Sequence, residues 1–189
     1  NNAITTVASL GSPEQMGELL QKAQDHPDWL PAIAQGVRYN AKEPPLKSRA
    51  MMFLNSKVAD IRIAAAGLCG AWKVSSAEDL LAKGAKDSKT IEEAEAMADA
   101  LARIGSKDLL EQLAGSSEAD LQRVAAVAAS SRVDPSSTAV QAGALLVSLK
   151  DPALAIVLVE AFLSRPEGPE LLLSLIDISE PTRHSVIAY

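Results

Sequence analysis

The feature that most constrains this chain is an internal repeat of about 30 residues, in which an Ala-rich segment precedes a shorter Leu-bearing one. The clearest copies occupy residues 58–84, 91–115, 119–149 and 152–172. In the first copy, Ile61, Ala65 and Leu68 recur at the spacing of one helix face. Period-2 alternation is not sustained anywhere in the sequence, so we predict an all-α chain built from helix pairs. Pairs repeated at a fixed period stack into a solenoid, an architecture that mostly binds other molecules.

The first 57 residues also read as helices. Ser12 followed by Pro13 is a strong helix start, and we expect that helix to run to about Gln24. A second helix should begin near Asp28, and a short one should follow a loop at 42–45 and cover 46–54.

Capping residues and apolar helix faces indicate where the later helices begin and end. Thr90 and Glu93 have the spacing of a capping box, and Gly105 is placed as a C-cap. Asp151 and Pro152 open a helix at 153–163 that is apolar on almost every side. Such a helix is normally packed between neighbours, so we expect this one to be buried on both sides.

The repeats resemble HEAT-type repeats of the short variety. The resemblance is carried by residues 60–68 (DIRIAAAGL) and by residues 120–126 (DLQRVAA), and it covers roughly residues 45–172. It implies an α-solenoid that winds as a right-handed superhelix. The residues themselves agree with this, since one Asp and one Arg in each unit can pair between stacked turns.

Two short segments resemble the helical-repeat region of large secreted proteins from planctomycetes and their relatives. These are residues 66–73 (AGLCGAWK) and 161–168 (AFLSRPEG). In that family a propeller similar to sugar dehydrogenases precedes the repeats and a c-type haem domain follows them. The resemblance implies a periplasmic or secreted location. The Cys-x-x-Cys-His haem signature does not occur in these 189 residues, so a redox role would belong to neighbouring domains.

The C-terminal residues resemble a translated sequencing-library adapter. Residues 173–183 read LSLIDISEPTR, and only Asp177 departs from the adapter translation LSLIHISEPTR. We therefore expect residues 1–172 to be a fragment of a longer repeat array and 173–189 to be a non-native tail, and we assign no functional role to His184 or Tyr189. The alternative is a genuine repeat helix that ends at residues 179–181.

Composition excludes several classes of function. The chain has 18 basic and 24 acidic residues, a net charge of −6, and its basic residues form no run, so we predict no nucleic-acid binding. The longest apolar stretch, 153–159, is too short to span a bilayer. A single cysteine, Cys69, excludes an internal disulfide.

Candidate chemical groups are sparse. We interpret His26 as part of a solvated loop, Cys69 as a small buried hydrophobe, and Gly67 and Gly70 as permitting close helix contact. The remaining candidates are charged. We interpret Arg62, Arg103 and Arg123 as a ladder of side chains that joins the repeats, and the alternative is that they line a binding groove. We interpret four acidic residues of one helix as its solvated face: Glu92, Glu93, Glu95 and Asp99.

The sequence therefore predicts a non-catalytic helical-repeat scaffold that contacts a protein partner or neighbouring domains of its own chain. We assign no catalytic, cofactor-binding or metal-binding residue and expect no cofactor. The alternative role is a spacer segment in a multidomain haem-linked oxidoreductase. An enzyme built on the repeats themselves is disfavoured because aromatic residues, which such grooves need, make up only 3% of the chain.

Overall fold

The computed structural model describes residues 2–39, 42–116 and 119–179, and in these ranges the chain is helical with no β-strand. This confirms the predicted all-α class. The α-helices of the first half are α1 (Asn2–Leu10), α2 (Pro13–Lys22), α3 (Leu30–Val37), α4 (Ala59–Ala71) and α5 (Glu78–Asp87). Those of the second half are α6 (Ile91–Ile104), α7 (Lys107–Ser116), α8 (Asp120–Val133), α9 (Pro135–Ser148), α10 (Pro152–Leu163) and α11 (Gly168–Ser179). The 3-10 helices are η1 (Pro27–Trp29), η2 (Lys47–Asn55) and η3 (Ser75–Ala77).

The predicted helix starts are found, with small shifts. The Ser12 hydroxyl accepts a hydrogen bond from the Gln15 backbone N–H, and the Gln15 side-chain oxygen accepts one from the Ser12 backbone N–H, so the cap is a full capping box. The helix ends at Lys22, slightly before the expected Gln24. The predicted helix at 46–54 is the 3-10 helix η2, and the expected start near Asp28 falls in η1, ahead of α3.

Later caps are formed by the residues that the sequence indicated. Gly105 ends α6 with φ +101°, a left-handed conformation that glycine adopts without strain. The backbone N–H groups of Gly105 and Ser106 both donate to the Leu101 carbonyl at 3.0 Å. Asp151 begins α10 by accepting from the Ala153 N–H at 2.9 Å.

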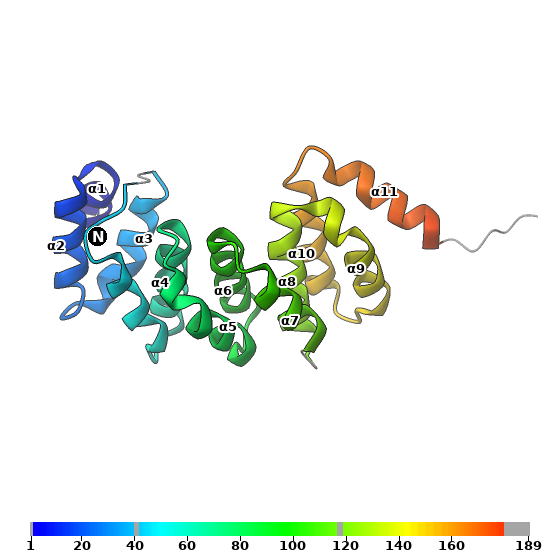
Figure 1. Ribbon diagram of the computed structural model, residues 1–189, viewed down its shortest axis with the longest axis horizontal. Coiled ribbons are helices and arrows are strands. Elements are labelled where there is room, and N and C mark those ends of the chain that lie inside the picture. The colour runs from blue at the N-terminus through cyan, green and yellow to red at the C-terminus, as the bar shows by residue number, and fades with distance from the viewer. Residues whose placement is uncertain (1, 40–41, 117–118, 180–189) are drawn as a thin grey trace, which may run out of the picture.

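The helices pack in two rows. In the first row, α1, α3, α4, α6, α8 and α10 follow one another, and each packs on the next. In the second row, η2 packs on α2 and on α5, α5 packs on α7, and α9 packs on α11. The second-row members η2, α5, α7 and α9 also contact the first-row helix of the following unit. Figure 1 shows the result: the helices extend along the length of the molecule from α1 and α2 at one end to α9, α10 and α11 at the other.

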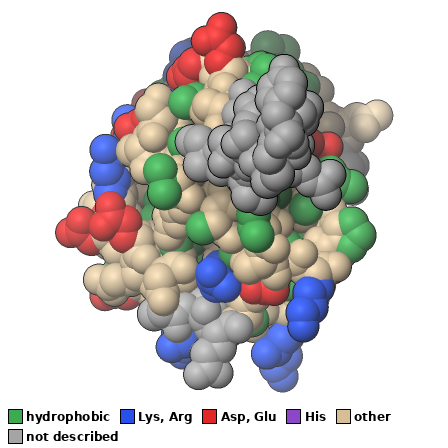
Figure 2. Space-filling model, turned by 90° about the vertical axis from the view of Figure 1, so that its right-hand side faces the viewer, with side chains coloured by type: hydrophobic (Ala, Val, Ile, Leu, Met, Phe, Trp, Pro, Cys, Tyr) green, Lys and Arg blue, Asp and Glu red, His purple; other side chains and the backbone are tan. Residues whose placement is uncertain are grey.

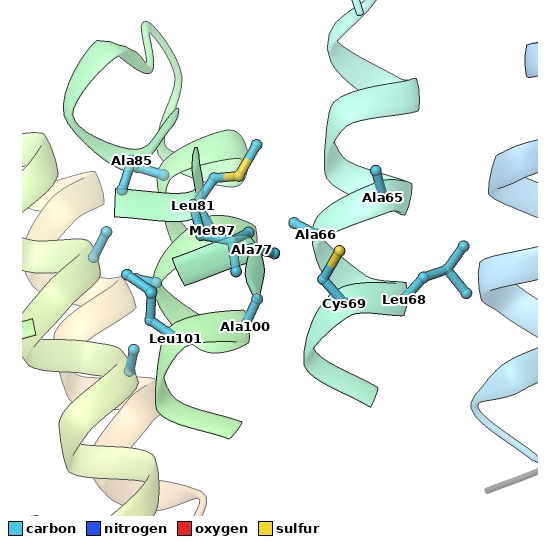
Figure 3. Packing of buried hydrophobic residues seen from close by; sticks show 14 of the residues in the cluster. Ala65, Ala66, Leu68, Cys69, Ala77, Leu81, Ala85, Met97, Ala100 and Leu101 are labelled. Carbon is cyan, nitrogen blue, oxygen red and sulfur yellow. The ribbon is translucent and has the colours of Figure 1, made fainter. Parts of the chain in front are cut away.

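Small side chains set the spacing in the first row. Ala66 and Cys69 lie on the side of α4 toward α5 and α6, and Leu68 lies on the opposite side, toward α3 (Figure 3). A Cβ at Gly70 would approach the Ala100 Cα of α6 to 2.8 Å, so the two backbones meet here because neither residue is larger. The prediction for Gly70 is confirmed. It is wrong for Gly67, which is exposed and has open space around it.

The expectation for α10 is wrong in part. The helix buries Leu158, Ala161 and Phe162 against the preceding units, but Ile156 and Leu163 remain more than half exposed. Its sequence is apolar on all sides, yet only one side has a first-row neighbour. None of the described helices has the length and apolar character needed to cross a membrane.

The predicted boundary at residue 172 falls inside a helix. The backbone of α11 continues from Gly168 to Ser179 without a break. The rest of the proposed adapter-derived tail, including His184 and Tyr189, lies outside the described residues. The assignment of 173–189 as non-native stays a prediction.

Candidate functional site

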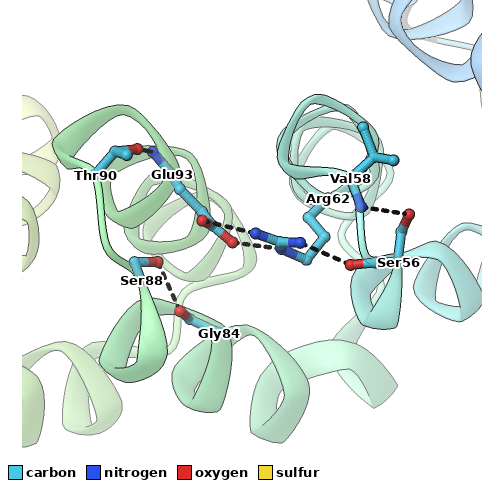
Figure 4. A network of polar contacts seen from close by, with 7 residues as sticks. All are labelled: Ser56, Val58, Arg62, Gly84, Ser88, Thr90 and Glu93. Carbon is cyan, nitrogen blue, oxygen red and sulfur yellow. Dashed lines mark hydrogen bonds and ion pairs between the residues drawn. The ribbon is translucent and has the colours of Figure 1, made fainter.

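An ion pair joins α4 to α6 and is the most buried charged contact among the described residues (Figure 4). Arg62 Nε and Nη2 donate to the two carboxylate oxygens of Glu93 at 2.5 and 2.9 Å, and Nη1 donates to the Ser56 carbonyl at 2.7 Å. The Glu93 side chain is only 7% exposed. The hydrogen bond with Glu93 raises the pKa of Arg62. Because these contacts occupy the guanidinium, Arg62 joins two units.

The same pair explains why the predicted capping box is only half formed. Thr90 accepts from the Glu93 N–H at 3.4 Å, as expected of an N-cap. The Glu93 carboxylate, which would complete the box, turns instead to Arg62. The bidentate contact with a guanidinium is the stronger hydrogen bond, since both groups are charged.

A second ion-pair group joins α8 back to α6. Arg132 donates to Glu95 at 2.5 Å and to Asp99 at 2.7 Å. Burial lowers the pKa of Arg132, but the hydrogen bond with Glu95 and the charge of Asp99 outweigh it, so the net pKa is raised. The interpretation of Glu93, Glu95 and Asp99 as a solvated face is therefore wrong: all three hold neighbouring helices. Glu92 is exposed, as expected.

The predicted arginine ladder is correct for one of its three members. Arg62 bridges two units, whereas Arg123 pairs at 3.3 Å with Asp120 of its own helix. Arg103 is exposed, and its aliphatic stem lies beside Gly70. Sequence reasoning missed Arg132, although its position 33 residues after Asp99, close to one repeat length, was a usable signal.

The two candidate reactive side chains have structural surroundings. Cys69 is fully buried, and burial raises the pKa of its thiol to about 12, so the predicted apolar role is confirmed. His26 is exposed in a turn and stacks on Trp29, with ring centroids 4.8 Å apart. Within the part of the chain that the structure describes, no three His, Cys, Asp or Glu side chains gather where they could hold a metal ion.

A groove opens in the second row between α7 and α9. These two helices contact each other less than the neighbouring second-row pairs α5 and α7, or α9 and α11, do. The space between them is a pocket of about 240 Å³. We call it the α7–α9 groove, and its apolar floor is formed by Ala102, Leu110, Ala114 and Val133.

The rim of the α7–α9 groove is polar. Lys107 and Glu111 lie on the α7 side, and Asp134, Ser137 and Gln141 lie on the α9 side. The rim carries both signs of charge and several hydrogen-bonding groups, while Val133 in the floor is 48% exposed. The arrangement can bury an aliphatic side chain and hydrogen-bond the chain that carries it. No sequence motif indicates this groove, because it is formed between units.

Comparisons with protein-family models, with curated proteins and with solved structures found no match to this chain.

Proposed function

We propose that the chain is an α-solenoid of short HEAT-like helix pairs and that it acts as a non-catalytic scaffold, binding a protein partner in the α7–α9 groove. The two rows of helices support the solenoid assignment. So do the side-chain bonds between units: Arg62 reaches 31 residues forward, Arg132 reaches 33 and 37 residues back, and Gln122 reaches 34 residues back. These separations match one repeat. The right-handed superhelix remains part of the proposal.

The groove itself is the observation that carries the binding role. It lies between the repeats 91–115 and 119–149, where a stacked-unit scaffold offers its partners a surface. Its volume is below the roughly 300–1,000 Å³ of pockets that enclose a small molecule. It is large enough for one or two aliphatic side chains of a peptide, such as leucine or methionine, whose backbone would meet the polar rim.

A peptide-display experiment tests this role. Random peptides displayed on phage are selected on the immobilised chain, and the affinity of the enriched peptides is measured by fluorescence polarisation. The variant Val133→Lys places a charge in the groove floor and should weaken binding at least about tenfold, since burying an aliphatic group is worth about 1.5–3 kcal/mol.

The matched control is Val140→Lys. Val140 is on α9, is 82% exposed and lies outside the groove, so this variant should bind the peptides as the parent chain does. Equal binding by the Val133 and Val140 variants, or no enriched peptide at all, would overturn the groove as the binding site.

The alternative role, a spacer between a propeller and a c-type haem domain, concerns domains other than these 189 residues. It stays a prediction, as does the periplasmic or secreted location.

A further inference from the structure

The two sides of the α7–α9 groove differ in charge. On the α7 side, Lys107 and Glu111 line the groove, and both are exposed. On the α9 side, Asp134 is charged, whereas Ser137 and Gln141 are not. Helix α9 itself contains no charged residue. The charged groups that a bound partner meets at the rim therefore lie mainly along α7.

The uncharged character of α9 agrees with the surface at its end of the molecule. Figure 2 faces the end where α9, α10 and α11 lie. Lys, Arg, Asp and Glu side chains lie mainly around the outline of this view, and hydrophobic or uncharged side chains occupy most of its middle. The α9 side of the groove therefore offers a partner hydrogen bonds, and the α7 side offers ion pairs.

The negative charge of Asp134 is largely compensated within the fold. Asp134 is the N-cap of α9, and its Oδ1 accepts from the Ser137 N–H at 3.2 Å. The positive end of the helix dipole offsets a carboxylate at this position. The Arg165 guanidinium adds a positive charge beside the start of α9, where it donates to the carbonyls of Arg132 and Val133 at 2.6 and 3.0 Å.

The two charged lining residues of α7 are not compensated in this way. Within the ranges that the structure describes, neither Lys107 nor Glu111 forms an ion pair or a side-chain hydrogen bond. They are four residues apart, a spacing of about 6 Å along a helix axis, and residues at this spacing often pair with each other. These two do not pair, so one positive and one negative group are available one helical turn apart on the same side of the groove.

We propose that the partner of the α7–α9 groove is a peptide segment in which an aliphatic residue lies between one acidic and one basic residue. This inference rests on the proposed function, since it requires a peptide in the groove. The aliphatic side chain occupies the floor beside Val133, the acidic residue pairs with Lys107, and the basic residue pairs with Glu111. On the α9 side, the Gln141 side-chain amide can both donate to the peptide backbone and accept from it.

The floor and the rim contribute differently to recognition. Burial of the aliphatic side chain supplies most of the affinity, because exposed ion pairs contribute little. The rim charges supply specificity instead, since a peptide with the opposite order of charges places like charges together. This specificity should weaken with salt, because the Debye length falls from about 10 Å at 0.1 M to about 3 Å at 1 M.

An exchange of charges on α7 tests the proposal. Lys107→Glu with Glu111→Lys reverses the order of the rim charges and keeps the net charge at −6. The probes are two fluorescein-labelled forms of the tightest peptide from the phage selection, with Asp and Lys on either side of the aliphatic residue in the two possible orders.

Fluorescence polarisation should show that the parent chain binds one form about three- to tenfold more tightly, and that the exchanged variant prefers the other form by a similar factor. In about 1 M salt both preferences should largely disappear. If parent and variant each bind the two forms equally, while Val133→Lys still weakens binding, the charge recognition is overturned and the groove remains the binding site. If Val133→Lys has no effect, the peptide lies elsewhere, and the inference and the proposed function both fail.

A matched control exchanges two charges of the same spacing on another helix. Glu18 and Lys22 of α2 are exposed and four residues apart, and α2 lies at the opposite end of the molecule from α9 (Figure 1). Glu18→Lys with Lys22→Glu should keep the peptide preference of the parent chain. A reversed preference in this control would overturn the proposal, because the rim of the groove would then not be what selects the peptide. Circular dichroism verifies that both exchanged variants are folded.

Discussion

Helices α8 and α10 differ in a way that their sequences would not suggest. Helix α8 contains Asp, Gln, two Arg and two Ser residues, yet it buries residues on nearly every side. Helix α10 has one charged residue and is otherwise almost wholly apolar, yet it buries only one side. The difference is their place in the first row: α8 packs on α6 and α10, with α7 and α9 also against it, whereas α10 packs on α8 and, less extensively, on α9 and α11.

The buried polar residues of α8 are tolerated because their donor groups are hydrogen-bonded. Gln122 donates to the carbonyls of Lys86 and Ser88, near the end of α5, at 3.2 and 3.1 Å. Ser131 donates to the Val127 carbonyl and lies 2.8 Å from the Thr138 hydroxyl. In a stacked row, the burial of a helix therefore follows the number of helices packed against it. The amino-acid composition of the helix determines the free-energy cost of that burial, because buried polar groups need hydrogen-bond partners.

The largest expected change in stability comes from placing a charge in the buried helix α8, and it is compared with the same change on the exposed side of α10. Val124→Asp puts an unpaired charge at a fully buried position of α8 and should lower the free energy of unfolding by at least about 4 kcal/mol or prevent folding. Ile156→Asp, on the exposed side of α10, should change it by less than about 0.5 kcal/mol. Urea denaturation followed by circular dichroism measures both. Similar losses in the two variants would contradict the contrast.

A smaller effect distinguishes an ion pair between units from one within a helix. A double-mutant cycle replacing Arg62 and Glu93 by Ala should give a coupling energy of about 2 kcal/mol, because the pair is largely buried and bidentate. The matched cycle on Asp120 and Arg123, an exposed pair within α8, should give less than about 0.5 kcal/mol. Equal coupling in both cycles would mean that Arg62 and Glu93 do not hold α4 and α6 together.

The smallest effect concerns two glycines of α4 that the sequence does not distinguish. Gly70→Ala forces α4 and α6 apart and should cost about 1–2 kcal/mol, because its Cβ would overlap the Ala100 backbone. Gly67→Ala meets only open space and should raise stability by about 0.5–1 kcal/mol through helix propensity alone. Thermal melts of the two variants give the sign of each change, and a stabilising Gly70→Ala would show that the contact is looser than described.

Much of the fold could be predicted because local signals are strong. Ser12, Gly105 and Asp151 cap helices within a few residues of themselves, so the sequence near each one is sufficient. The start of α4 is less local: no side chain caps it, and Arg62 instead reaches the Ser56 carbonyl just before the helix. The exposed side of α10 could not be predicted, because an apolar sequence shows that burial is favourable and does not show whether another helix packs against it.

The site was harder to predict for the same reason. Glu95 and Asp99 look like a solvated face until α8 brings Arg132 against them. Glu93 fits a capping box by spacing, and only the proximity of Arg62 decides otherwise. The α7–α9 groove depends on how far two units splay apart, a quantity set by packing over many residues and by none of them singly.

The side-chain hydrogen bonds between units join residues that are close in sequence, and this has a consequence for the rate of folding. The side chains of Lys47, Arg62, Gln122, Arg132 and Arg165 bond partners that lie between 25 and 37 positions away. A fold assembled from such contacts has a low contact order, and closing short loops costs little chain entropy. Each unit can therefore nucleate on the one before it as the chain leaves the ribosome, without waiting for the C-terminus to be made.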